Sequence, residues 1–187
     1  VALGQAGKRV ILADLDLGAS NLHIALGSGS VKYGIGTFLN SKEIDFDDII
    51  LDTDYKNLRF IPGDAEIPGI ANLKSSQKQK ILRRLNALDA DYLILDLGAG
   101  SSYNIIDFFL SSNNGIIVTA PTLTATLNAY LFLKNVVFRF IDSSFPKKSP
   151  AHAHIESIKG DISNLQKVYI PKLLDTVQKE DPEGFQE

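Results

Sequence analysis

Cysteine, methionine and tryptophan are all absent from this chain of 187 residues. The lack of cysteine excludes a disulfide framework, a thiolate metal site and thiol catalysis, and it fits a reducing compartment. No apolar run in the sequence approaches the ~20 residues that span a bilayer, and no segment is typical of a signal peptide. We therefore expect a cytoplasmic protein.

An excess of basic charge is also missing. The formal net charge is −3 and the pI is about 5.6, which argues against a protein that coats nucleic acid through general attraction. A local basic patch is compatible with this balance. Hydrophobic residues make up 44% of the chain, enough for a compact domain with its own core.

Apolar runs and helical patterns alternate along the first three quarters of the chain. Buried strands are predicted at residues 9–13, 57–61, 92–95 and 115–119, and helices at 75–88, 103–110 and 124–140. This alternation predicts an α/β fold with a doubly wound, mostly parallel sheet and helices on both faces. We expect one α/β domain over residues 1–142 and a helical or irregular insertion or tail over residues 143–187.

Acidic residues stand where two of the predicted strands end. Asp14 and Asp16 follow one apolar run, and Asp96 follows another. In a parallel sheet the carboxyl ends of strands form the edge at which ligands bind, and clustered carboxylates suit Mg²⁺. The other interpretation is a solvated loop in which Asp16 or Ser20 caps a helix.

The segments around these acids resemble a known family. Residues 7–22, Gly-Lys-Arg-Val-Ile-Leu-Ala-Asp-Leu-Asp-Leu-Gly-Ala-Ser-Asn-Leu, are similar to the second conserved box of the MinD/ParA family of deviant Walker ATPases. Residues 96–100, Asp-Leu-Gly-Ala-Gly, resemble the Walker B and switch II segment of that family, and residues 116–122 resemble its next strand. The resemblance covers residues 1–134 and looks closest to the flagellar-number regulators of the FlhG/FleN type.

The resemblance implies a P-loop NTPase fold and a site for ATP or ADP with Mg²⁺. Asp16 would position or polarise the attacking water, and Asp96 would bind Mg²⁺. Asp14 would support the metal. These residue types are suited to slow hydrolysis of ATP, because phosphoryl transfer depends mainly on positioning and on neutralising charge.

The resemblance also assigns residues to the phosphates of the nucleotide. Asn21 would hold the switch I loop on the phosphates, and Gly98, Ala99 and Gly100 would sense the γ-phosphate. The implied function is a spatial switch for cell division, chromosome partition or flagellar placement. Such a switch forms an ATP-dependent homodimer and is stimulated by an activating partner protein. It can be recruited to a pole, the nucleoid or a membrane.

Several parts of the family pattern do not occur in these residues. The Gly-rich phosphate loop is expected just before Val1, because residues 1–5 are typical of the end of a helix. The adenine-contacting segment and the C-terminal membrane-binding helix are not visible either. Contact with DNA or a membrane surface is therefore not supported by these residues.

Two other functions remain open from the sequence. A receiver-like phosphoacceptor module also gathers acids at strand ends, with Thr119 in the place of its threonine, but a strand that ends in lysine does not follow. A non-catalytic relative could keep the fold as a binding scaffold. His152 and His154 lie in a stretch that we expect to be a loop without a bound metal.

Overall fold

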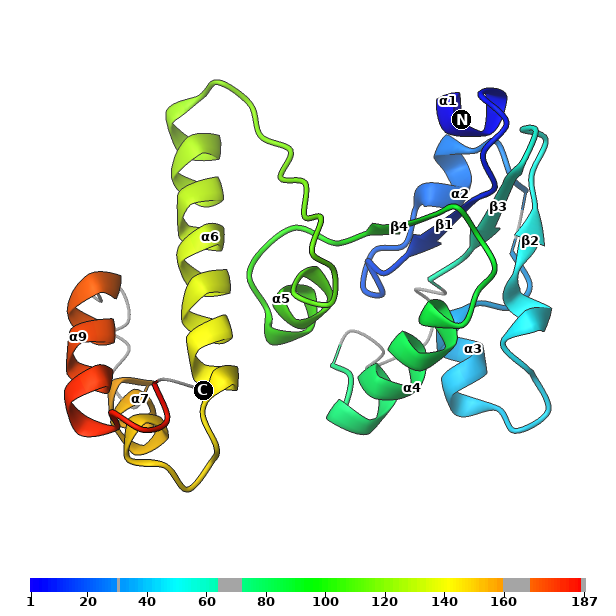
Figure 1. Ribbon diagram of the computed structural model, residues 1–187. Coiled ribbons are helices and arrows are strands. Elements are labelled where there is room, and N and C mark those ends of the chain that lie inside the picture. The colour runs from blue at the N-terminus through cyan, green and yellow to red at the C-terminus, as the bar shows by residue number, and fades with distance from the viewer. Residues whose placement is uncertain (30, 64–71, 160–168, 186–187) are drawn as a thin grey trace. The chain divides into compact units, whose positions relative to one another are not determined.

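The computed structural model describes residues 1–29, 31–63, 72–159 and 169–185 (Figure 1). It consists of two compact units, Val1–Asn114 and Gly115–Glu187. The change in character that the sequence indicates after residue 142 falls inside a long helix, α6 (Leu123–Ser144).

The first unit is built on a four-stranded sheet in the order β2-β3-β1-β4. Its strands are β1 (Val10–Asp14), β2 (Leu51–Asp52), β3 (Leu58–Ile61) and β4 (Tyr92–Asp96). Strand β1 runs parallel to both β3 and β4, whereas the short β2 pairs antiparallel with β3. The mostly parallel α/β sheet predicted from the sequence is thus confirmed.

Helices cover both faces of this sheet, because successive side chains of a strand point to opposite faces. Val10 and Phe60 face a core that includes residues of α1 (Ala2–Gln5) and α2 (Leu22–Ala25). Ile11 and Ala13 face a second core. That core is completed by α3 (Ile35–Asn40), the short 3₁₀ helix η1 (Asp47–Ile49), α4 (Ser75–Asn86) and α5 (Tyr103–Phe109).

Helix α4 shows how the sequence pattern produces this packing. Ile81 and Leu85 are buried because they lie one turn apart on the same face of the helix. At its beginning, the Gln77 side chain accepts a hydrogen bond from the Lys74 backbone N–H at 2.9 Å. This contact satisfies a backbone donor at the helix N-terminus. The helix predicted over residues 75–88 is confirmed.

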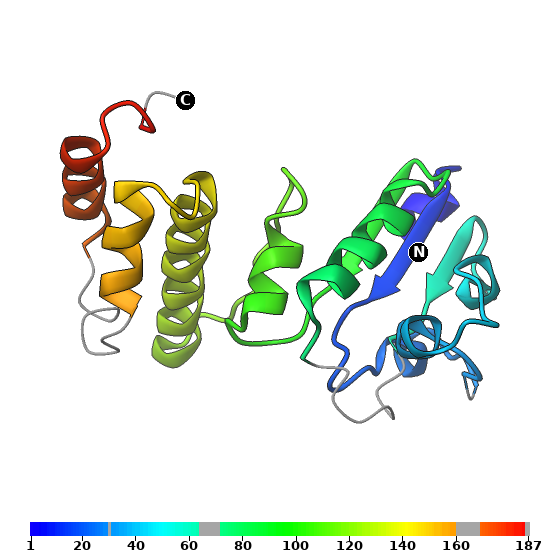
Figure 2. The same cartoon turned by 90° about the horizontal axis from the view of Figure 1, so that it is seen from below.

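The second unit is helical in its described part. Its helices are α6, α7 (Pro150–Lys159) and α9 (Ile170–Glu180), which Figure 2 shows side by side. Their shared core consists of Ile141, Phe145, Ala151, Ile155, Leu173 and Val177. No helix in the described parts of the chain combines the length and the apolar character needed to cross a bilayer.

The predicted strand at residues 115–119 is wrong. These residues form no strand, and Ile116 and Val118 are 86% and 91% exposed. A strand requires hydrogen bonding to a neighbour, whatever the β-propensity of its residues. Among the described residues, the sheet of the first unit ends at β4, and no strand pairs with residues 115–119.

Gly4 allows the turn before β3 to pack closely against α1. A Cβ atom at this position would lie 2.3 Å from the backbone oxygen of Lys56. Gly4→Ala should therefore lower the free energy of unfolding by about 1–3 kcal/mol, the usual cost of overpacking. Gly29→Ala is the matched control, since nothing lies within 4 Å of its added Cβ. Urea unfolding followed by circular dichroism tests this, and equal midpoints for the two variants would contradict it.

Candidate functional site

Three predicted acids meet at the carboxyl edge of the sheet in the first unit. Asp14 and Asp96 are register partners at the ends of β1 and β4. The next residue, Leu15, donates its backbone N–H to the Asp96 carbonyl oxygen at 2.8 Å. Asp16 follows directly, so the two strand ends bring the carboxylates of Asp14, Asp16 and Asp96 into one place.

The backbone at Gly98, in the segment after β4, lies close to the Asp16 side chain. A Cβ atom at Gly98 would lie 2.6 Å from Asp16 Oδ1 and 2.8 Å from its carboxyl carbon. The half-buried carboxylate of Asp16 therefore lies against the backbone at Gly98, in space that a larger residue would occupy. This contact joins a residue of the predicted switch II segment to the predicted catalytic carboxylate.

The three carboxylates repel one another. The pKa of Asp96 is raised above its ordinary value, first by burial and then by the negative charges of Asp14 and Asp16. Within the described parts of the chain, none of the three forms an ion pair with a basic side chain. An uncompensated set of carboxylate oxygens is the donor chemistry that Mg²⁺ prefers, so the residues present fit this ion.

Asp14 differs from the other two acids because its oxygens are already engaged. It is only 1% exposed. Its Oδ1 accepts a hydrogen bond from Asp16 N at 3.1 Å, and its Oδ2 accepts from Ser20 Oγ at 2.7 Å and Leu22 N at 3.1 Å. These contacts fold the segment between β1 and α2 around the Asp14 side chain. They suit a supporting role for Asp14 better than direct contact with an ion.

The remaining predicted residues belong to the loops that follow these strands. Asn21 is exposed at the N-cap position of α2, and its side chain makes no capping hydrogen bond. Ala99 and Gly100 are exposed after β4. Gly100 has a φ of 99°, a backbone conformation that glycine adopts at little cost. Both loops leave the carboxyl edge that carries the acids, and their contacts with phosphate remain predictions.

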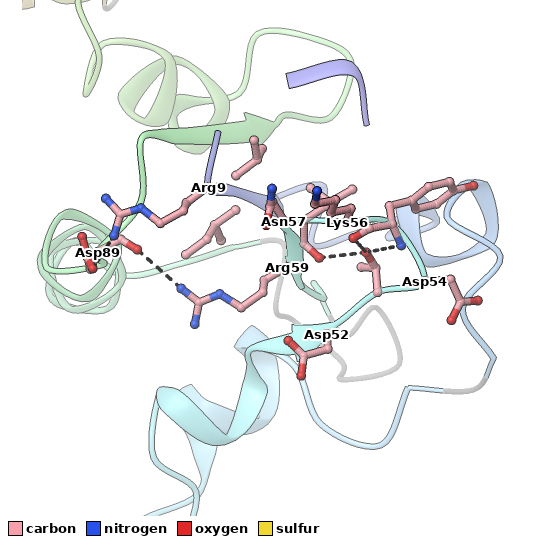
Figure 3. Close-up of a pocket in the computed structure, with 12 residues that line it drawn as sticks. Arg9, Asp52, Asp54, Lys56, Asn57, Arg59 and Asp89 are labelled. Carbon is pink, nitrogen blue, oxygen red and sulfur yellow. Dashed lines mark hydrogen bonds and ion pairs between the residues drawn. The ribbon is translucent and has the colours of Figure 1, made fainter. Parts of the chain in front are cut away.

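A hollow lies at the edge of the sheet opposite the acids, where β1 and β3 begin (Figure 3). Its volume is about 630 Å³. The Arg9 guanidinium forms ion pairs with Asp89 at 2.5 Å and Asp91 at 2.9 Å, and Arg59 donates to the Asp89 carbonyl oxygen at 3.5 Å. The sequence does not indicate this hollow, because the turn between β2 and β3 that forms it carries no distinctive motif. Basic and acidic side chains line it together, so its charge favours neither sign of ligand.

A second cluster of charged groups lies in the helical unit. Ligand atoms of Asp142, His152 and Glu156 lie within 4.8 Å of one another. However, Lys159 Nζ lies between the two carboxylates, at 2.7 Å from Asp142 Oδ1 and 2.6 Å from Glu156 Oε1. Arg139 also pairs with Asp142, at 3.1 Å. The cluster is thus a charge-balanced network in which an ammonium group holds the position between the acids.

The prediction that His152 and His154 lie in a loop is wrong. Both belong to α7, and His152 Nδ1 lies 3.6 Å from Asp142 Oδ1. Burial lowers the pKa of Lys159 most strongly, but its hydrogen bonds to Asp142 and Glu156 outweigh this and leave the pKa raised. The stability that Lys159 contributes is therefore present at neutral pH and is lost as the pH rises through the raised pKa.

The chain is similar in sequence to several curated proteins over about two thirds of its length. No protein-family model matches the chain. The septum site-determining protein MinD of Synechocystis sp. is 29% identical over 130 residues, 68% of this chain and 48% of the relative. The antiactivator FleN of Pseudomonas aeruginosa is 23% identical over 136 residues, 72% of this chain and 48% of the relative. The chain thus spans about half the length of the curated relatives it matches.

Solved structures agree on the fold. The structure of MinD from Pyrococcus horikoshii, complexed with Mg-ADP, superposes with a TM-score of 0.63 at 23% identity. The match covers 74% of this chain and 56% of the other. At this identity the likeness establishes the fold, an α/β fold of the type found in MinD.

Asp96→Asn should stabilise the protein when no Mg²⁺ is present. The ionised Asp96 repels Asp14 and Asp16 only in the folded state, so stability falls as the pH rises from 3.8, the ordinary pKa, through the raised pKa. The neutral variant should therefore melt at a higher temperature than the wild type at pH 7, and this gain should vanish below the ordinary pKa. Asp54→Asn at the opposite edge is the control. A lower melting temperature for Asp96→Asn at pH 7 would disprove the repulsion.

Asp142→Asn should destabilise the helical unit. Asp142 is 4% exposed, and the substitution removes the buried negative charge that faces Lys159 and Arg139. We expect the free energy of unfolding to fall by about 2–4 kcal/mol. This is less than the largest cost of breaking a buried ion pair, because Lys159 is partly exposed. Asp175→Asn on the exposed side of α9 is the control. Chemical unfolding measures the difference, and an Asp142→Asn variant as stable as this control would contradict the expectation.

Proposed function

Because the chain belongs to the MinD/ParA family of deviant Walker ATPases, we propose that it binds Mg-ATP at the carboxyl edge of its sheet and hydrolyses it slowly. The observation that supports this most strongly is the meeting of Asp16 and Asp96 at the ends of adjacent parallel strands. Neither carboxylate has a basic partner among the described residues. A bound cation would relieve their repulsion.

Asp96 and Asp16 have different tasks in this proposal. Asp96, partly accessible to solvent at the end of β4, would hold Mg²⁺, and the bound ion would neutralise the charge that develops on the phosphate oxygens. Asp16, half-buried against Gly98, would orient the attacking water and accept its proton. Asp14 would keep the backbone of Asp16 in place through the hydrogen bond at 3.1 Å.

Asn21 and the segment 98–100 would contact the phosphates from two sides. Both follow strand ends at the acidic edge, and glycine at positions 98 and 100 lets backbone N–H groups approach an anion closely. The Gly-rich phosphate loop of the family has no counterpart in the 187 residues. These residues therefore supply the acidic side of the proposed site.

We further propose that nucleotide binding controls assembly of the protein. Loops that order around a γ-phosphate are a common way to convert nucleotide state into a change of partner. The expected result is an ATP-dependent homodimer in the cytoplasm that an activating protein stimulates. The names of the relatives, a septum site-determining protein and an antiactivator, favour a regulatory task in cell division or in flagellar placement.

The receiver-like alternative gains no support. Thr119 is exposed, lies in the second unit and follows no strand, whereas the acids belong to the first unit. A non-catalytic scaffold remains as an outcome of the following test.

Hydrolysis and binding can be separated by variants of the two acids. The full-length protein should bind a fluorescent ATP analogue with Mg²⁺ and release phosphate. Asp16→Asn should lower the rate of phosphate release about 100-fold, the contribution of a general base, and leave nucleotide affinity near that of the wild type. Asp96→Asn should weaken Mg²⁺-dependent binding about tenfold or more.

Asp54→Asn serves as the matched control, because Asp54 lines the hollow at the other edge of the sheet. It should behave as the wild type in both assays. Binding without any phosphate release would favour the scaffold. A wild-type protein that neither binds nucleotide nor hydrolyses it would disprove the proposed function.

A further inference from the structure

The segment that carries Asp16 is attached to the end of β3 by one hydroxyl group. Ser20 Oγ donates a hydrogen bond to Asp14 Oδ2 at 2.7 Å and accepts one from Gly63 N at 3.2 Å. We propose that Ser20 is a positioning residue for Asp16, which acts by linking the ends of β1 and β3. The proposal rests on the function assigned to Asp16 above.

The link reaches Asp16 through two further contacts. Ser20 has one hydroxyl hydrogen, and its bond to Asp14 Oδ2 fixes the rotation of that carboxylate. The other oxygen of the same carboxylate then accepts the backbone N–H of Asp16 at 3.1 Å. A continuous series of hydrogen bonds therefore runs from Gly63 N through Ser20 and Asp14 to Asp16 N. Asp16 in turn lies against Gly98.

Burial and a backbone hydrogen bond fix the β3 end of the link. Pro62 and Gly63 are buried directly after β3, and the Pro62 carbonyl oxygen accepts the backbone N–H of Ile35, at the beginning of α3, at 2.9 Å. A Cβ atom at Gly63 would lie 2.8 Å from the Asp14 carbonyl oxygen and 2.9 Å from Ser20 Oγ. Glycine at this position is therefore what permits the close approach of the hydroxyl.

Core packing of Leu15 and Leu17 restrains the backbone beside Asp16, and the Ser20 link restrains the residues that follow. Gly18 and Ala19 are exposed, in contrast to the buried Asp14. Without the hydroxyl, Asp14 Oδ2 loses its shortest hydrogen bond and the buried Gly63 N–H loses its acceptor. The Asp16 carboxylate would then occupy a wider range of positions. Misplacement of a reacting group by about 1 Å can lower a rate about 100-fold.

The kinetic test compares Ser20→Ala with Ser20→Thr, which keeps the hydroxyl. We expect Ser20→Ala to lower kcat for ATP hydrolysis about 10- to 100-fold while the KM for ATP stays near the wild-type value. Ser20→Thr should recover most of the rate. The control is Ser28→Ala, which removes a hydroxyl after α2 that makes no hydrogen bond to the described residues.

Three kinetic results would overturn the proposal. The first is a Ser20→Ala variant with the kcat of the control. The second is a loss of kcat that Ser20→Thr does not repair. The third is a loss of kcat that only matches the fraction of unfolded protein at the assay temperature. A structural role alone predicts this last result, because unfolding removes active enzyme without changing the enzyme that remains folded.

Hydrogen exchange separates this proposal from the proposed ATPase function. In Ser20→Ala, the amides of Asp16 and Gly63 should both exchange faster than in the wild type, with or without nucleotide. A wild-type protein without ATPase activity would disprove the function but leave this coupling measurable. Unchanged exchange at Asp16 in Ser20→Ala would disprove the link itself, whatever the activity of the wild type.

Discussion

The parallel pairing of β1 with β4, with Asp14 opposite Asp96, is the constraint on which the rest of the first unit depends. This register brings two acidic strand ends to one edge. It also lets the Leu15 N–H donate a hydrogen bond to the Asp96 carbonyl oxygen at 2.8 Å. A shift of the register would move every side chain of a strand relative to its neighbour. The cores on both faces of β1 prevent such a shift, so the packing of the sheet fixes the geometry of the acids.

The acidic edge combines one carboxylate that accepts several hydrogen bonds with two that have no basic partner among the described residues. Asp14 accepts three hydrogen bonds and is buried, whereas Asp96 carries a pKa raised by burial and by its acidic neighbours. The first arrangement stabilises the fold, and the second opposes it. An arrangement that opposes folding is expected where a ligand supplies the missing charge. Asp142 in the helical unit shows the contrast, because Lys159 and Arg139 neutralise it within the chain itself.

Much of this arrangement could be predicted from the sequence, for identifiable reasons. The helix predicted over residues 75–88, observed as Ser75–Asn86, has a strong period of 3.6 residues. The strands that end at Asp14 and Asp96 are apolar runs followed by acids and glycines. These acids lie at one edge because the carboxyl ends of parallel strands meet at the same edge of a sheet. The close contact between Gly98 and Asp16 and the hydrogen bonds of Ser20 depend on loop conformation, which no periodic pattern specifies. Residues 115–119 have the composition of a strand but lack a partner in the described structure, and pairing is a tertiary property.

The most direct test of the central claim is the pKa of Asp96 itself, followed by NMR of carboxyl-labelled aspartate with and without Mg-ATP. We predict that Asp96 titrates above the ordinary value of 3.8 in the free protein, first because its carboxyl group is partly desolvated and then because Asp14 and Asp16 repel its charge. We also predict that Mg-ATP moves this pKa down, because a cation at the acidic edge favours the ionised carboxylate. A pKa of Asp96 that is unchanged by Mg-ATP would contradict the claim that these acids hold the ion of a bound nucleotide.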